Sequence, residues 1–366
     1  MFFRVPSNTT LPPSTSTHAF PFRWWEFVWY LLIMLVGCVG NLLVILVIVL
    51  NKRIELTSTF NMHVSLLAVA DLFVSMVGLP IYYLSTDAFN HPAGIRGDQL
   101  CSLFTGYFLP FFLLDISVFA LVLIALGRRK AIIHPYSVLS EESVTRKTIP
   151  IATVVFISLA LGVPTIYGLK YSPTDPIVGN HCTYRYTFIQ SIIIYCVVFS
   201  VDTIVPIVVL VTCFRQISKS LARTNKFLRN SIAVNQSTIN KRKDAAMKQK
   251  QKSIATMRLV VLAFFVCILP NHLLYLASLA GVNGLAWDTD ISQVGVLVRF
   301  TNSCVNPLLY SFMSQKFRKN LKSTFPVFFK ARKPKIIYNK RNLFPRNDGY
   351  VAIKENEQYS ASSNIF

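Results

Sequence analysis

The sequence has few charged residues for its length, since only 14% of its 366 residues are Asp, Glu, Lys or Arg while 53% are hydrophobic. The mean hydropathy is +0.48. A soluble domain needs far more polar surface to face water. The composition therefore excludes an ordinary soluble protein and indicates a membrane protein.

The sequence also lacks the local patterns on which many enzyme sites are built. It contains no glycine-rich phosphate loop, no His and Cys cluster with metal-ligand spacing and no nucleophile motif. Its basic segments lack the interleaved aromatic residues of a nucleic-acid stacking platform. We therefore expect no enzymatic activity, no nucleic-acid partner and no organic cofactor.

Long apolar segments account for most of the chain. A helix needs about 20 apolar residues to cross a bilayer, and seven segments of about that length are present: 24–50, 60–84, 103–126, 148–169, 188–214, 254–280 and 291–313. The predicted fold class is an all-α membrane protein in which residues 24–313 form a bundle of seven transmembrane helices.

Basic residues are distributed unevenly between the two sides of this layout. Of the 37 Lys and Arg residues, 31 lie in or beside the first, third and fifth connections or in the C-terminal tail. The other six are Arg4, Arg23, Arg96, Lys170, Arg185 and Arg299. Because short loops rich in Lys and Arg stay in the cytoplasm, we expect a multi-pass plasma-membrane protein whose residues 1–23 are extracellular.

The segment after the seventh span predicts a short helix on the membrane surface. Within 314–325, Phe317, Leu321 and Phe325 recur at every fourth position among lysines. That spacing gives an amphipathic helix with one face towards lipid. Residues 326–366 are polar and basic, so we expect a flexible cytoplasmic tail.

Two of the seven cysteines, Cys101 and Cys182, are expected outside the cell. That space is oxidising, so a disulfide between the third span and the loop before the fifth is plausible. The other five lie in spans and are interpreted as packing residues. On the same side, Asn8 begins an Asn-Thr-Thr glycosylation acceptor.

Polar side chains inside the spans carry the functional information, because such groups are costly in lipid. The second span contains Asp71. Polar residues at comparable depth are Asn41, Ser117, Asn302, Ser303 and Asn306. Their oxygen atoms can share a hydrated cation with the carboxylate. The alternative is a hydrogen-bond network that only ties helices together.

Six short sequence motifs occur in a defined order, each within or beside a particular predicted span. They are Gly40-Asn41, Leu67-Ala-Val-Ala-Asp71, Arg128 followed by His134-Pro135, Pro206, Phe264-x-x-Cys267-x-Leu-Pro270, and Asn306-Pro307-Leu-Leu-Tyr310. In this arrangement the sequence resembles a rhodopsin-like (class A) G-protein-coupled receptor from about Trp24 to Phe325.

The resemblance implies roles for matching positions. Arg128 would meet a heterotrimeric G protein, and Tyr310 would swing towards it on activation. Asp71, Ser117, Asn302, Ser303 and Asn306 would form a sodium-binding core. The resemblance also implies a peptide ligand, and it implies that arrestin and a receptor kinase act on serines of the tail.

The sequence departs from the family's pattern around the cytoplasmic switch. The family usually has an acid before the arginine and an aromatic residue after it, where this chain has Gly127 and Arg129. Phe214 stands where a tyrosine is usual. We predict a weakly restrained resting state with raised ligand-free activity, because the charge pair is lost. The stretch from Cys101 to Arg128 is also two residues longer than usual.

On the family's geometry, a set of polar residues would line a central ligand cavity: Asp115, Asp202, Asn271, His272, Tyr275 and Arg299. Either the two carboxylates receive a cationic ligand group, or Arg299 neutralises one or both of them internally. A small-amine receptor is disfavoured, because the aspartate that anchors amines would fall near residues 108–110.

A membrane transporter or ion-conducting protein is the alternative function. Asp71, Asp115, Asp202 and Arg299 can mark an ion path. Transporters usually contain paired repeats, and the halves of this sequence are not self-similar. Uptake or conductance would favour the transporter, and guanine-nucleotide exchange would favour the receptor.

Overall fold

The computed structural model describes residues 24–51, 58–84, 92–134, 143–172, 182–231, 237–282, 285, 289–313 and 315–326. Residues 326–366 form a separate unit, of which only Pro326 is among the described residues. Residues 1–23, which include Asn8, are not among them either. The predictions of an extracellular segment, a glycosylation site and a flexible tail therefore fall on residues that are not described.

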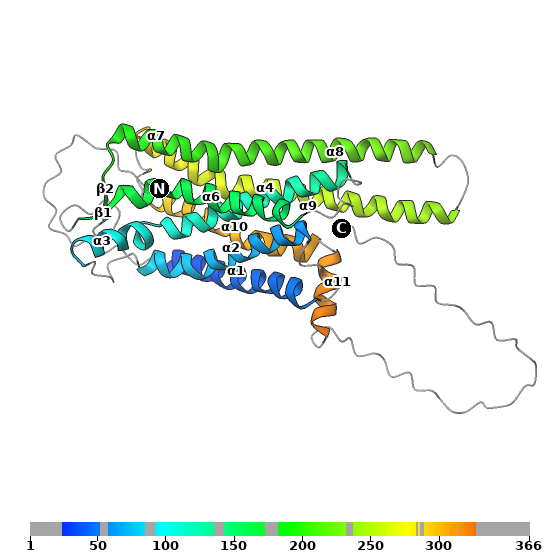
Figure 1. Cartoon of the computed structure of the whole chain (residues 1–366), viewed down its shortest axis with the longest axis horizontal. Helices are drawn as coiled ribbons and strands as arrows, with labels where there is room; N and C mark the ends of the chain where they lie inside the picture. Colours follow the sequence, from blue (N-terminus) through cyan, green and yellow to red (C-terminus); the bar gives the residue numbers. More distant parts are fainter. Residues whose placement is uncertain are drawn as a thin grey trace, which may run out of the picture. The chain divides into compact units, whose positions relative to one another are not determined.

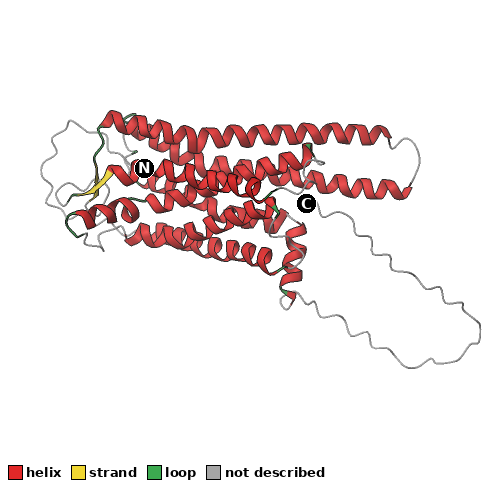
Figure 2. Ribbon diagram, in the orientation of Figure 1, coloured by secondary structure: helices red, strands yellow, loops and turns green. Residues whose placement is uncertain are grey.

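Seven long helical segments lie side by side in the described part of the chain (Figures 1 and 2). They are α1 (Trp24–Leu50), α2 (Thr59–Leu84), α4 (Phe108–Ile133), α6 (Val144–Gly168), α7 (Phe188–Phe199) continued by α8 (Val205–Ser231), α9 (Ser237–Leu279) and α10 (Asp290–Met313). The predicted seven-helix bundle is confirmed.

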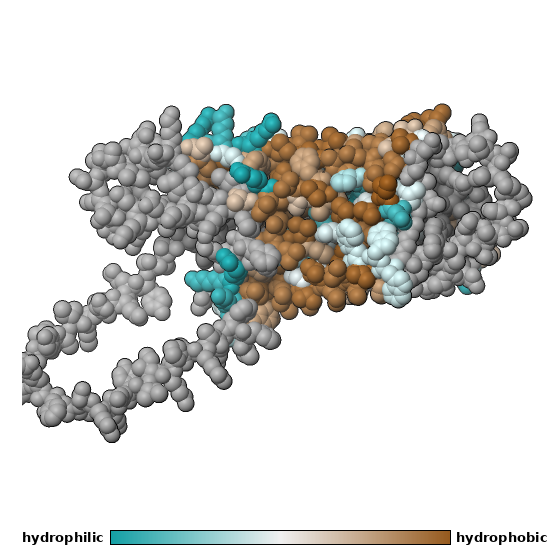
Figure 3. All heavy atoms as spheres, turned by 180° about the vertical axis from the view of Figure 1, so that it is seen from behind, coloured by the Kyte–Doolittle hydropathy of each residue, from teal (hydrophilic) through white to brown (hydrophobic). Residues whose placement is uncertain are grey.

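Apolar residues occupy both the inside and the outside of the bundle. A buried core joins α1, α2, α4, α8 and α9 through residues such as Val44, Leu67, Leu121, Ile217 and Phe264. Large apolar side chains are also exposed on the outer surface, where they form a broad hydrophobic band (Figure 3). Such a band suits lipid, which requires no polar surface and leaves backbone groups to be satisfied within the helices.

The last helix of the bundle, α10, is more polar than the others. Six described helical segments are long and apolar enough to cross a membrane, and α10 is not one of them. Its polar residues Arg299, Asn302, Ser303 and Asn306 are all buried. Its 24 residues span about 36 Å at 1.5 Å per residue, enough to cross the hydrocarbon core. The polar side chains therefore face the bundle interior instead of lipid.

The third span differs from the continuous segment 103–126 that the sequence predicted. It begins with α3 (Ile95–Leu100), continues as a π-helical segment over Cys101–Thr105, and breaks before α4. At the break Tyr107 has φ 65°. The π-helical turn and the break take up additional residues, which accounts for the long spacing between Cys101 and Arg128.

A second π-helical segment, Ser200–Ile204, interrupts the fifth span between α7 and α8. Helix also extends into the polar, basic segment between the fifth and sixth spans. The structure continues α8 to Ser231 and begins α9 at Ser237. A polar sequence of good helix formers can extend a helix that the membrane span has already nucleated.

The two ends of the bundle carry different elements (Figure 1). At one, the hairpin end, β1 (Leu169–Tyr171) pairs with antiparallel β2 (Cys182–Tyr184), and the predicted disulfide joins Cys101 to Cys182. At the other, the α11 end, α11 (Gln315–Thr324) packs against α1 and α10. This helix agrees with the predicted amphipathic helix over 314–325.

Candidate functional site

A pocket lies near the hairpin end, between α4, α6, α7, α9 and α10. Its empty space is about 550 Å³, including part of its opening. The lining residues are Phe108, Phe111, Phe112, Asp115, Leu161, Gly162, Thr165, Tyr195, Val198, Asn271, His272, Tyr275 and Arg299. Aromatic walls with a few polar groups are the usual composition of a ligand site. Five of the six residues predicted for the cavity are in this set.

The sixth predicted residue, Asp202, does not line the pocket and is fully buried. It lies in the π-helical segment of the fifth span. Its Oδ2 atom accepts a hydrogen bond from Arg299 Nη2 at 3.0 Å. Asp202 therefore lies behind the pocket lining and contacts Arg299, and its direct contact with a ligand stays a prediction.

Arg299 links three helical segments in the interior. The same Nη2 atom lies 3.5 Å from Asp115 Oδ1 on α4, and the guanidinium carbon lies 4.9 Å from the centre of the Phe111 ring. Internal neutralisation by Arg299, one of the two alternatives from sequence, is thus present in the structure. One guanidinium therefore serves two carboxyl groups.

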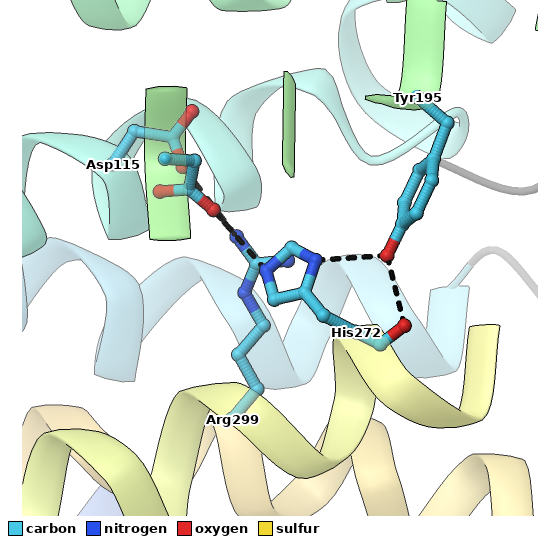
Figure 4. A network of polar contacts seen from close by, with 5 residues as sticks. Asp115, Tyr195, His272 and Arg299 are labelled. Carbon is cyan, nitrogen blue, oxygen red and sulfur yellow. Dashed lines mark hydrogen bonds and ion pairs between the residues drawn. The ribbon is translucent and has the colours of Figure 1, made fainter. Parts of the chain in front are cut away.

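His272 completes the cluster from α9. Its Nε2 atom lies 3.3 Å from Asp202 Oδ2, and its Nδ1 atom lies 2.9 Å from the Tyr195 hydroxyl on α7. Figure 4 shows the Tyr195 and His272 side chains meeting, with Arg299 and Asp115 approaching from the other side. The Tyr195 hydroxyl also donates to the backbone carbonyl of His272 at 3.1 Å, so both the ring and the main chain of His272 are tied to α7.

Apart from Tyr275, sequence reasoning missed the aromatic part of this site. The centre of the Tyr195 ring lies 4.3 Å from that of Tyr275, with the rings tilted by 49°, and Phe108 stacks at 5.6 Å on Phe112. Gly162 makes room for the Phe108 ring, since a Cβ atom at position 162 would lie 2.2 Å from it. In an apolar span, an aromatic residue that faces a cavity has the same sequence signature as one that faces lipid.

A second buried polar site surrounds Asp71, deeper in the bundle. Ser117 Oγ donates to Asp71 Oδ1 at 2.6 Å, and Asn306 Nδ2 donates to Asp71 Oδ2 at 2.8 Å. Asn41 instead donates to the backbone oxygens of Gly37 and Ser303. The hydrogen bonds of Asp71 join α2, α4 and α10, and those of Asn41 join α1 to α10.

The residues around Asp71 have the chemistry to hold Na⁺. Asp71 supplies a carboxylate and Ser117 a hydroxyl oxygen, which are hard ligands. The hydroxyl of Ser303 and the amide nitrogen of Asn302 are buried and have no hydrogen-bond partner among the described residues. A buried hydroxyl without a partner is costly, and a cation or water beside Ser303 would satisfy it.

Three of the predicted switch residues, Gly127, Arg128 and Arg129, lie near the C-terminal end of α4. The guanidinium carbon of Arg128 lies 4.9 Å from the centre of the Phe60 ring on α2. Arg129 donates from Nε to Gln216 on α8. A Cβ atom on Gly127 would have no neighbour within 4 Å. Arg128 is therefore restrained by an aromatic ring, a partner that the sequence did not predict.

Two further switch positions are only partly described. The Phe214 ring on α8 lies 5.9 Å from the guanidinium carbon of Arg258 on α9. Tyr310 belongs to α10, but its side chain lies outside the described ones. Its predicted movement towards Arg128 therefore stays a prediction.

The chain matches one known family over most of its length. The family model described as "7 transmembrane receptor (rhodopsin family)" matches residues 40–310. That range contains the pocket, the Asp71 site and Arg128.

Similar curated proteins share about a quarter of their residues with this chain. A QRFP-like peptide receptor from Branchiostoma floridae is 25% identical over 310 residues, which cover 80% of this chain and 75% of that receptor. The C-C chemokine receptor type 1 of Macaca fascicularis is 26% identical over 309 residues, covering 81% and 78%. The galanin receptor 2a of Danio rerio is 26% identical over 302 residues, covering 82% and 78%.

Proposed function

The chain belongs to the rhodopsin family of seven-transmembrane receptors, and from that premise we propose that it binds an extracellular peptide and activates heterotrimeric G proteins. It is a multi-pass membrane receptor and not an enzyme. Membership of this family does not favour the transporter alternative. The observation that carries the peptide proposal is that the three similar receptors are named for peptides or chemokines.

The proposal places the hairpin end outside the cell, in the plasma membrane. The disulfide between Cys101 and Cys182 is at that end and suits an oxidising space. Most basic residues belong to the connections and the tail at the opposite side, which suits the cytoplasm. The pocket would then open to the extracellular side, where a peptide can reach it.

The helices that line the pocket also carry the residues proposed for coupling. On α4, Asp115 precedes Ser117 by two residues and Arg128 by thirteen, so the pocket and Arg128 are separated by about 20 Å along one helix. On α10, Arg299 lies near Asn302, Ser303 and Asn306 in the sequence. A ligand that moves Arg299 would therefore disturb the Asp71 site and the Arg128 end together, as a two-state switch requires.

Na⁺ at the Asp71 site would favour one of the two states. Asp71, Ser117 and Ser303 would hold the ion, and its charge would compensate the buried carboxylate. In this proposal Asn302 and Asn306 orient the site. Receptor kinase and arrestin would act on serines of the tail after activation, and phosphate groups there would supply the negative charge that arrestin recognises.

Guanine-nucleotide exchange on purified Gα subunits tests the proposed function. The receptor is reconstituted in lipid vesicles and exposed to fractionated neuropeptides, with Arg128→Ala as the matched inactive variant. We expect at least one peptide fraction to accelerate exchange in the wild type and not in the variant. Failure of every fraction with every Gα subtype would contradict the proposal, and peptide-independent solute uptake by the same vesicles would support the transporter instead.

A further inference from the structure

Two buried carboxyl groups share one guanidinium at the base of the pocket. Asp115 and Asp202 both approach Arg299, which carries one positive charge. His272 lies with Nε2 3.3 Å from Asp202 Oδ2 and with Nδ1 2.9 Å from the Tyr195 hydroxyl. Buried charges are costly unless they are paired. The single guanidinium therefore cannot pair fully with both carboxyl groups.

Asp115 is held less tightly by Arg299 than Asp202 is. Asp202 has two cationic or hydrogen-bonding neighbours, Arg299 at 3.0 Å and His272 at 3.3 Å. Asp115 meets Arg299 at 3.5 Å, which is the outer limit of a hydrogen bond, and its carboxyl group also contacts that of Asp202. Asp115 also lines the pocket, whereas Asp202 does not. The poorly compensated carboxylate is thus the one that a ligand can reach.

The pocket walls suit a cation as well. Three phenylalanines of α4 and two tyrosines line it: Phe108, Phe111, Phe112, Tyr195 and Tyr275. The faces of aromatic rings attract cations, and Phe111 already holds the guanidinium of Arg299 at 4.9 Å. A weakly held carboxyl group at the base and aromatic rings on the walls favour the same class of ligand group.

We propose that Asp115 binds a guanidinium or ammonium group of the ligand, inserted between the aromatic walls. The ligand cation replaces the weak contact of Arg299 with Asp115, and Arg299 then pairs with Asp202 alone. This inference rests on the proposed function, since it names the chemical group by which a peptide would be recognised. An arginine or lysine side chain or a free amino terminus supplies such a group.

An anionic ligand group is the competing possibility, because Arg299 also lines the pocket. The guanidinium already has two carboxylates within 3.5 Å. An anion that approached it would face both, and like charges at short range repel. The geometry therefore favours the cation.

Three small probes of matched shape distinguish these possibilities without any G protein. They are 2-phenylethylguanidinium, the neutral 2-phenylethylurea and the anionic 3-phenylpropionate. Binding to the purified full-length receptor in lipid nanodiscs is measured by calorimetry or ligand-observed NMR. The proteins compared are the wild type, Asp115→Asn, the charge-retaining Asp115→Glu, and Asp290→Asn as a control that removes an exposed acid outside the pocket.

We expect the guanidinium probe to bind the wild type with a Kd on the order of 1 mM, as suits so small a ligand. Asp115→Asn should weaken it by about tenfold or more, because a charge-assisted hydrogen bond is lost. Asp115→Glu and Asp290→Asn should keep most of the binding. The urea and the carboxylate probes should bind at least about tenfold more weakly to the wild type.

Three results would overturn the inference. These are equal binding of the guanidinium to the wild type and Asp115→Asn, preference for the carboxylate probe, and no binding of the guanidinium at about 10 mM. Preference for the carboxylate would assign ligand recognition to Arg299. The assay needs no G protein, so the two proposals can fail separately. Selective probe binding without nucleotide exchange would contradict only the proposed function. Peptide-driven exchange without probe selectivity would contradict only this inference.

Discussion

Replacement of Gly127 by aspartate should lower ligand-free signalling. Gly127 precedes Arg128 on α4, and a side chain at position 127 has open space within 4 Å. A carboxylate there can therefore be added without displacing a neighbour. It would attract Arg128 and oppose the movement of that arginine towards a G protein.

The size of the effect follows from the surroundings of the two positions. Charges about 5 Å apart attract by about 3 kcal/mol at an effective dielectric constant of about 20. Both Gly127 and Arg128 are only half-buried, so water screens the pair, and exposed pairs contribute about 0.2–1 kcal/mol. A contribution of about 0.5–1 kcal/mol changes a two-state ratio by about two- to fivefold.

The assay is ligand-free nucleotide exchange in cells that express each variant at matched surface levels. Gly127→Asn is the control, because it adds a side chain of the same shape and replaces the flexible glycine without a charge. We expect Gly127→Asp to signal about two- to fivefold less than Gly127→Asn. Equal signalling by the two variants would refute the idea that the missing acid loosens the resting state.

Three other changes test separate parts of the structure. Phe60→Leu removes the ring that contacts Arg128. It should raise ligand-free exchange by about two- to fivefold, as expected for a cation–π contact of about 0.5–1 kcal/mol. Unchanged exchange would show that the ring does not restrain Arg128. Gly162→Ala places a methyl group against the Phe108 ring, so the ring must move into the pocket. Binding of the guanidinium probe should then weaken. Equal affinity would show that the Phe108 ring can move aside without narrowing the pocket. Asp71→Asn should remove any difference in peptide affinity between sodium chloride and choline chloride, and a difference that persists would place the ion elsewhere.

The seven spans and the disulfide could be predicted from sequence because each leaves a local or compositional signal. Apolar composition marks six of the spans in the described part of the chain, and the more polar α10 still has the length of a span. Cysteines expected on the same side mark the disulfide. These features follow from the amino-acid composition of each segment.

Features that depend on which face of a helix meets which neighbour could not be predicted. Tyr195 is one of several aromatic residues in an apolar span, and only packing shows that it meets His272. Phe60 looked like the first residue of a span, yet it holds Arg128. Asp202 was placed in the cavity by analogy, but the π-helical segment of the fifth span includes it and the structure buries it completely.

The central claim is that a peptide bound at the hairpin end drives a G protein at the α11 end. The most direct test measures peptide concentration against nucleotide-exchange rate for the wild type, Asp115→Asn and Arg128→Ala. We predict that Asp115→Asn raises the half-maximal peptide concentration by about tenfold with the same maximal rate, and that Arg128→Ala abolishes the peptide response. A peptide response that survives in Arg128→Ala, or that is indifferent to Asp115, would contradict the account.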